Sequence, residues 1–259
     1  MWKTQITNIN NNKMYIYGYD LLELMQDCSF ADVVLIMATG HMPKLHQKKL
    51  MEAILISCCD QGVYPPSTNA TRFVASCGVP LQASVAAGIL GFGEYHGGAI
   101  EACAKLLQQT VQDSLDNSVE TTAYRVVAEY KDRNRRIPGF GHAYFDSDPR
   151  SKKLLEIADS CISPHPHIDL LRAIENVFSS QRERPLAANI NGAIGAAISD
   201  LGIDWRMGRG IFIVSRAIGL VCHALEEVKG GTKYKKIGAK DIDYQGPPPR
   251  DIPLRIEPS

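Results

Sequence analysis

The sequence predicts a mainly helical protein with a small β-hairpin at its N-terminus, and three observations support this fold class. Apolar residues recur at intervals of three and four in most segments from Leu21 onward, as amphipathic helices require. Capping signals precede several of these segments, and Asp148-Pro149 is the clearest of them. Residues 2–18 alternate polar and apolar around Asn10-Asn11-Asn12, a pattern typical of a hairpin.

The expected helices follow one another along the chain with short connections. Their approximate ranges are 21–25, 30–37, 45–58, 68–74, 81–93, 97–111, 121–134, 149–158, 168–178, 192–197 and 210–227. Ser67 would cap the fourth of them, and the small residues of 81–93 would allow close helix packing. His165 and His167 are expected in a loop. From Lys229 the chain is rich in Gly and Lys and then in Pro, which predicts an extended tail.

Length and composition limit the classes of function. A chain of 259 residues can bury a substantial core in one or two domains. Lys plus Arg and Asp plus Glu are balanced at 28 each, so no global field draws the protein to nucleic acid or to an anionic membrane. The N-terminus has no apolar signal core, and no apolar run approaches the roughly 18 residues that span a bilayer. We therefore expect a cytoplasmic metabolic or binding protein.

The seven cysteines are scattered, without a CxxC pair or the spacing of a zinc site. We expect them to be reduced and buried, and we expect no metal centre.

The strongest candidate site is the stretch from Ile137 to Arg150, Ile-Pro-Gly-Phe-Gly-His-Ala-Tyr-Phe-Asp-Ser-Asp-Pro-Arg. Gly139 and Gly141 lead directly to His142, which suits a loop whose backbone approaches a ligand or adopts positive φ. Arg150 would lie in the first turn of a capped helix, where the guanidinium and the helix N-terminus together favour a carboxylate. A tight turn with a hydrogen-bonded core histidine fits the same spacing equally well.

Gly-Phe-Gly-His-Ala followed by Asp-Pro-Arg resembles the signature of the citrate synthase family, and similar segments recur in order as far as Tyr244. Because the chain is much shorter than a typical citrate synthase, it most resembles the short citryl-CoA lyases, which share the fold and run related chemistry in the cleaving direction. The resemblance implies a large helical domain made of residues 1–96 and 200–259, with a smaller helical domain at 97–199 inserted into it. It also implies a homodimer, no bound cofactor, and a coenzyme A thioester and an oxo acid as small-molecule partners.

The resemblance assigns roles to four side chains. His-Gly-Gly-Ala at His96 is similar to the family motif in which a neutral imidazole donates to the thioester oxygen, and the following helix N-terminus would favour that neutral form. Ser-Arg-Ala-Ile-Gly at Arg216 resembles the segment whose arginine binds a substrate carboxylate. A cation in such an apolar helix needs a partner in any case. By the same resemblance His142 donates to the oxo-acid carbonyl, and Arg150 holds a carboxylate.

The loop that binds coenzyme A in this family corresponds to Gly139, Phe140 and Gly141, with Arg136 beside it at the end of the basic cluster 133–136. The family commonly has a cation a few residues after the motif histidine, where this chain has Asp146. A carboxylate there would repel phosphates, so either the preceding arginines substitute for the cation or coenzyme A binding is altered. A solvated charged face is the other interpretation of the cluster.

Three positions depart from the family pattern at places that handle substrate. Asn191, in Asn-Ile-Asn-Gly, stands where the family has an aspartate as catalytic base, and an amide has no useful basicity. Gln61 stands where a histidine helps to hold the oxo acid; it can donate a hydrogen bond but carries no charge. No arginine precedes Tyr244 to match the family's tail arginine, and Lys240 replaces it only loosely.

The sequence therefore predicts a citryl-CoA lyase-like enzyme that cleaves citryl-CoA, or a related 3-hydroxyacyl-CoA, to acetyl-CoA and an oxo acid such as oxaloacetate. Its base position is altered to Asn191, and Asp60 is the nearest replacement that the sequence suggests. The alternatives are a citrate synthase-type condensation, a CoA-thioester hydrolase and a non-catalytic protein that binds CoA thioesters. The direction of reaction stays open, because both directions share one transition state.

Overall fold

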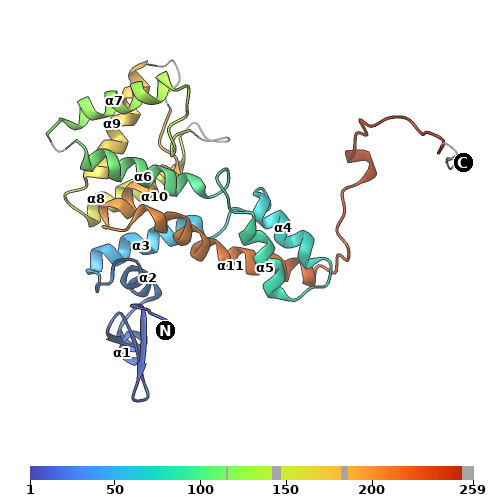
Figure 1. Ribbon diagram of the computed structural model, residues 1–259, viewed down its shortest axis with the longest axis horizontal. Helices are drawn as coiled ribbons and strands as arrows, with labels where there is room; N and C mark the ends of the chain where they lie inside the picture. Colours follow the sequence, from blue (N-terminus) through green and yellow to red (C-terminus); the bar gives the residue numbers. More distant parts are fainter. Residues whose placement is uncertain (115, 142–146, 182–185, 253–259) are drawn as a thin grey trace, which may run out of the picture.

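The computed structural model of the protein describes residues 1–114, 116–141, 147–181 and 186–252 (Figure 1). Within these ranges the chain forms eleven α-helices, two short 3-10 helices and one three-stranded sheet, which confirms the mainly helical fold class. The helices are α1 (Leu21–Asp27), α2 (Phe30–Thr39), α3 (Leu45–Cys58), α4 (Pro66–Ala75), α5 (Leu81–Leu90), α6 (Gly98–Gln112), α7 (Val119–Asp132), α8 (Pro149–Cys161), α9 (Pro166–Gln181), α10 (Ile190–Asp200) and α11 (Gly208–Lys229), with 3-10 turns at Trp205–Met207 and Ala239–Asp241.

The N-terminal sheet consists of β1 (Thr7–Asn10), β2 (Lys13–Ile16) and β3 (Tyr19–Asp20), which pair antiparallel in that order. The expected hairpin is therefore confirmed and has a third strand. Its turn residues Asn11 and Asn12 have φ of 48° and 62°. Asparagine tolerates this left-handed region, and two consecutive positive φ values match the twist of a hairpin. In Figure 1 the sheet and α1 lie at one end of the molecule.

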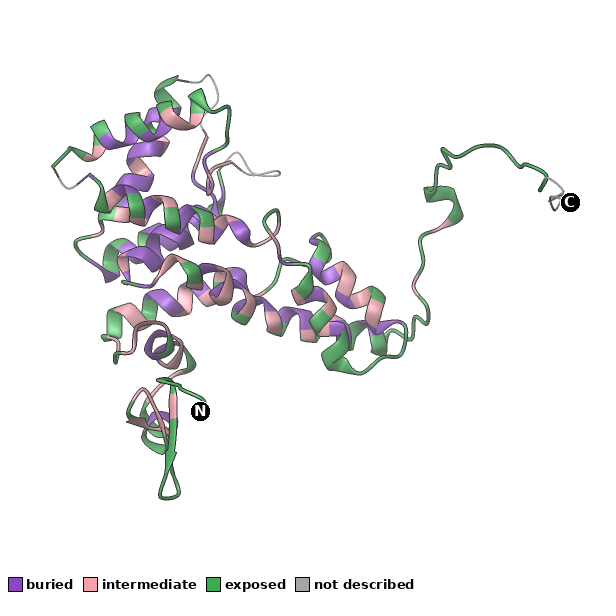
Figure 2. Cartoon of the chain, viewed as in Figure 1, coloured by how far each residue is buried: buried purple, intermediate pink, exposed green. Residues whose placement is uncertain are grey.

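The core is centred on α10, in which almost every residue is buried. Helix α6 packs along it so closely that a Cβ at Gly195 would lie 3.0 Å from the Ala104 nitrogen and 3.1 Å from the Ile100 oxygen. The small residues of α10 thus let two helix backbones touch. Helices α7, α8 and α9 complete this group, and Figure 2 shows the buried residues concentrated in it.

Helix α11 connects this core with α4 and α5, which lie apart from the α6–α10 group in Figure 1. Its N-terminal half contacts α3 and α6, and its C-terminal half contacts α4 and α5. The predicted close packing of the small-residue helix is confirmed, because a Cβ at Gly88 of α5 would lie 2.1 Å from Thr71 Oγ1 of α4. The division into domains at residues 96 and 199 stays a prediction.

Two local predictions are wrong. Ser67 does not cap α4, since the helix already begins at Pro66 and the buried Ser67 hydroxyl instead bonds His96. His167 is not in a loop but in the first turn of α9, with Nδ1 2.6 Å from Asp200 Oδ1. The Asp200 carboxylate also accepts the backbone N–H groups of His167 and Ile168, so α10 caps α9.

The seven cysteines are all free, as expected of reduced thiols. The expectation that all are buried is wrong, because Cys77 and Cys222 are exposed. In the described part of the chain, none of the helices combines the length and apolarity that crossing a membrane would require.

Candidate active site

Arg216 lies in the middle of α11 and is 1% exposed. Its Nε donates to the carbonyl oxygen of Cys58 at the end of α3, at 2.7 Å, and its Cζ lies 4.9 Å from the centroid of the Phe212 ring. One turn further, Gly219 allows the two segments to approach, since a Cβ there would lie 2.4 Å from the Cys59 oxygen. A helix C-terminus and an aromatic face therefore stabilise this cation in part.

What Arg216 lacks is a directly paired acid, since the Asp60 carboxylate acts on it only electrostatically. Among the described residues no carboxylate forms an ion pair with it, and its Nη1 is buried without a hydrogen-bond partner. Burial lowers the pKa of Arg216, but a guanidinium stays protonated in proteins. A buried cation with an unused N–H group is costly, so the arrangement favours a ligand that brings a carboxylate.

His96 precedes the first turn of α6 and shares the Phe212 ring with Arg216. The His96 and Phe212 ring centroids are 6.0 Å apart, and the His96 and Phe92 ring centroids are 5.2 Å apart. His96 Nε2 is 2.8 Å from the hydroxyl of Ser67. Burial and the nearby Arg216 charge lower the pKa of His96, which keeps the imidazole neutral at neutral pH. This direction agrees with the predicted neutral form, and its causes are burial and the Arg216 charge.

Arg150 lies in the first turn of α8, as predicted, and Asp148 caps this helix. The Arg150 guanidinium binds its own cap residue through two contacts, Nε to Oδ1 at 3.1 Å and Nη2 to Oδ2 at 2.9 Å. Asp148 is buried and also accepts the Ile190 N–H of α10, at 3.1 Å. Burial opposes ionisation, but these hydrogen bonds outweigh it and lower the pKa of Asp148. Asp148 thus joins Arg150 to the N-terminus of α10.

The glycines of the signature stretch allow its backbone to pass very close to the backbone at the start of α10. Gly139 has φ of 89°, and a Cβ on Gly192 would lie 2.4 Å from the Gly139 oxygen. Gly141 donates to the Ala187 oxygen at 2.9 Å, and the Asn189 side chain donates to the Gly141 oxygen at 2.6 Å. This contact joins the signature loop to the N-terminus of α10. The assignment of these glycines to coenzyme A binding stays a prediction.

Phe140, also predicted to bind coenzyme A, packs its ring against Phe178 with a centroid distance of 5.4 Å. Arg136 is exposed and forms no ion pair with the described residues. His142 and Asp146 lie outside the described residues, and their roles stay predictions.

Asn191 occupies the second position of α10, inside the helix and not before it as predicted. Its backbone N–H donates to the side chain of Asn189, the helix cap, at 2.9 Å. Its side chain makes no hydrogen bond with the described residues. An unengaged amide at this place is free to meet a ligand but cannot take a proton from it.

Gln61 lies in the exposed turn that follows α3, next to Asp60. The Asp60 carboxylate is 3.0 Å from His223 Nε2 of α11, and it accepts the Gly62 N–H at 2.9 Å. Arg216 and His223 therefore both hold the segment after α3, since residues seven positions apart lie on roughly the same face of a helix.

The structure brings His96 and Arg216 together around one aromatic ring, and Arg150 acts on Arg216 only electrostatically. Arg216 shares an aromatic ring with His96, and the positive charge of Arg150 helps to lower the pKa of Arg216. The partners that hold these groups were missed from the sequence: Ser67 for His96 and Phe212 and the Cys58 carbonyl for Arg216. Of the partners of the site residues, only Asp148, which binds Arg150, was indicated by the sequence, through the Asp-Pro-Arg spacing. A cavity of about 590 Å³ among α6, α7 and α9 is lined by none of the predicted site residues.

These features define a helical protein with a histidine of lowered pKa beside a buried arginine that has an unpaired N–H group. Residues 42–237 match the model of the C-terminal domain of citrate synthase. The chain therefore belongs to the citrate synthase family. Its fold is similar to that of the citryl-CoA lyase from Hydrogenobacter thermophilus, with a TM-score of 0.90 and 39% identity over 98% of each chain.

Two further relatives differ in the reaction after which they are named. A probable ATP-citrate synthase of Dictyostelium discoideum is 27% identical over 216 residues, which is 77% of this chain and 34% of that protein. A 2-methylcitrate synthase of Shewanella oneidensis is 29% identical over 82% of this chain and 54% of its own. The chain thus spans about a third to a half of the length of these relatives.

Proposed function

We propose that this protein is a citryl-CoA lyase-like enzyme, which cleaves citryl-CoA or a related 3-hydroxyacyl-CoA to acetyl-CoA and an oxo acid such as oxaloacetate. The observation that carries the proposal is Arg216, which is buried, forms no ion pair with the described residues and has Nη1 unpaired. The likeness in fold and sequence to a citryl-CoA lyase over nearly the whole chain supports the same conclusion.

In this reaction the 3-hydroxyl group loses its proton and becomes the oxo group, the adjacent carbon–carbon bond breaks, and its electron pair passes to the thioester carbonyl as an enolate. A proton then adds to the enolate carbon and gives acetyl-CoA. His96, neutral and held by Ser67, would donate a hydrogen bond to that developing oxyanion. Arg216 would hold a substrate carboxylate with the N–H groups that the protein leaves unused. Arg150 would hold a second one with the donors that Asp148 does not occupy.

This mechanism requires a general base that removes the hydroxyl proton. Asn191 stands in the position of the family base and cannot perform this step. Loss of a general base typically costs on the order of 10²–10⁴ in rate. A non-catalytic CoA-thioester-binding protein is therefore the second candidate, and the unengaged Asn191 amide is the observation that favours it.

The first experiment is to assay the purified protein with citryl-CoA and to follow release of acetyl-CoA and oxaloacetate, beside a His142→Ala control. Release that disappears in the control supports the lyase. Binding of the thioester without release supports the non-catalytic candidate.

Asn191→Asp separates the base position from the rest of the pocket. We expect cleavage to rise by about 10²-fold or more if only the base is missing. No rise, with the fold intact by circular dichroism, would mean that other parts of the pocket have also lost the reaction.

We also propose that the protein is a homodimer in the cytoplasm. In support, the apolar side chains Val214, Ile218, Leu225 and Val228 are 42–60% exposed on α11, spaced at helical intervals along it. Sedimentation of Ile218→Glu should give a monomer where the unmodified chain gives a dimer. The seven free cysteines suit a reducing compartment.

A further inference from the structure

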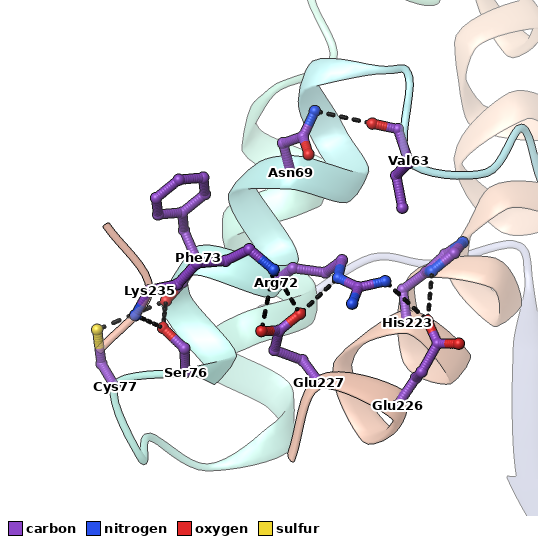
Figure 3. A network of polar contacts seen from close by, with 10 residues as sticks. All are labelled: Val63, Asn69, Arg72, Phe73, Ser76, Cys77, His223, Glu226, Glu227 and Lys235. Atoms are coloured by element: carbon purple, nitrogen blue, oxygen red, sulfur yellow. Dashed lines mark hydrogen bonds and ion pairs between the residues drawn. The ribbon is translucent and has the colours of Figure 1, made fainter. Parts of the chain in front are cut away.

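A continuous chain of polar contacts runs from the C-terminal segment to the turn that carries Gln61. Figure 3 shows most of it, where α4, α11 and the segment after α11 meet. Its six members, from the C-terminal segment inward, are Lys235, Glu227, Arg72, Glu226, His223 and Asp60.

Glu227 binds Lys235 and Arg72 at the outer end of this series of contacts. Its side chain is 1% exposed, and its carboxylate lies 2.9 Å from Lys235 Nζ and 2.5 Å from Arg72 Nε. The backbone N–H groups of Tyr234 and Lys235 also donate to the carbonyl and the hydroxyl of Ser76, each at 2.9 Å. Residues 234 and 235 are thereby seated on α4 through both backbone and side chain.

His223 lies in the middle of this series of contacts. Arg72 Nη1 is 2.7 Å from Glu226 Oε2, and the same carboxylate oxygen is 3.5 Å from His223 Nδ1. The other ring nitrogen, Nε2, is 3.0 Å from Asp60 Oδ1. The imidazole is 15% exposed, so two carboxylates fix its orientation in a largely shielded place.

Asp60 forms the inner end and holds the turn around Gln61. Burial acts against ionisation, but hydrogen bonds from the Gly62 and Gln61 N–H groups and from His223 lower the pKa of Asp60. A carboxylate so engaged is a poor general base, which argues against Asp60 as the replacement for the family base. Arg216 holds the start of the same segment at the Cys58 carbonyl.

We propose that His223 is a positioning residue for substrate. It couples the docking of residues 234 and 235 against α4 to the conformation of the Asp60–Gly62 turn beside Arg216. Gln61 is then held for a substrate carboxylate only while the C-terminal segment is docked. This inference rests on the proposed function for the identity of the substrate, whereas the coupling itself is a property of the chain alone.

Hydrogen exchange tests the coupling without any turnover. In Lys235→Met we expect the Gln61 and Gly62 amides to exchange about 3- to 10-fold faster, because the outer contact that orders the chain is gone. Lys233→Met is the matched control, since Lys233 is exposed and pairs with none of the described residues. Faster exchange confined to residues 234–235 and α4 would overturn the proposal.

Substrate kinetics then distinguish positioning from simple support of the fold. His223→Leu should raise KM for citryl-CoA about 10-fold with kcat changed less than about 2-fold. His223→Gln keeps a donor where Nε2 lies and should restore KM. In His223→Leu the further change Lys235→Met should have no added effect, and additive effects would contradict the coupling.

If the unmodified protein does not cleave citryl-CoA, calorimetric titration with citrate replaces the kinetics. The same variants should then weaken citrate binding in the same order. Unchanged exchange at residues 61 and 62 overturns the positioning role whether or not the lyase reaction occurs.

Discussion

Helix α11 carries two buried charges with opposite surroundings. Glu227 is 2% exposed and contacts two cations of its own chain, Arg72 and Lys235. Arg216 is 1% exposed and forms no ion pair with the described residues; the Asp60 carboxylate acts on it only electrostatically, and Nη1 is unpaired. A buried charge that the chain neutralises itself joins structural elements, whereas one that it leaves unmatched marks a place where a ligand supplies the opposite charge.

The largest expected effect comes from removing the unmatched charge. Arg216→Met should lower kcat/KM for citryl-CoA by about 30-fold to several-thousand-fold, because a shielded charge pair with substrate contributes roughly 2–5 kcal/mol. The free energy of unfolding should stay equal or rise by about 1–2 kcal/mol, since the unpaired cation costs stability. Activity assays and urea denaturation measure the two quantities.

Arg206→Met is the matched control for this variant, because Arg206 is an exposed arginine paired with Asp204. It should change neither quantity appreciably. A marked loss of stability in Arg216→Met without ligand would mean that the arginine serves the fold and not the substrate.

A smaller effect is expected at the matched charge. Glu227→Gln should lower the free energy of unfolding by about 2–4 kcal/mol, because it leaves Arg72 and Lys235 without their shared carboxylate in a shielded place. Glu226→Gln removes an exposed partner of the same Arg72 and should cost about 1 kcal/mol or less. Equal costs in the two variants, measured by urea denaturation, would remove the distinction between buried and exposed pairs.

The smallest expected effect concerns the pH dependence of stability, which differs between His96, beside Arg216, and Glu227. The pKa of His96 is lowered below 6.5, so the unfolded chain takes up this proton first, and stability falls as the pH drops from about 6.5 toward the folded pKa. Burial acts against ionisation of Glu227, but Lys235 and Arg72 outweigh it and lower its pKa below 4.5. Its contribution is therefore fully present above about pH 4.5 and is lost only as the pH falls through the folded value.

His96→Gln should abolish the slope of stability against pH just below 6.5 and leave the slope below 4.5 in place. Glu227→Gln should reduce the slope below 4.5, to which the lowered pKa values of Asp148 and Asp60 also contribute, and leave the slope just below 6.5 in place. Thermal unfolding measured across this pH range checks both, and an unchanged upper slope in His96→Gln would show that another group titrates there.

Much of the site follows from local sequence. Asp148-Pro149 predicts the start of α8 and so places Arg150 in its first turn, because a cap residue and proline act within one helical turn. The apolar residues around Arg216 predict a buried cation in need of a partner, and both predictions agree with the structure. Ser67 was misassigned because a serine that caps a helix and a serine that bonds a distant imidazole look alike in sequence.

What the sequence by itself determined is the family, the helical fold class, the order of the helices and the residue types at the site, since periodicity, capping and motifs are local. Only the tertiary structure decided which charges meet. Arg72 and Glu226 are 154 positions apart in sequence, and Asp60 and His223 are 163 apart, so no local pattern joins them. The packing of α3, α4 and α11 decides that Glu227 is matched and Arg216 is not, because the energy of a buried charge depends on neighbours that only folding brings close.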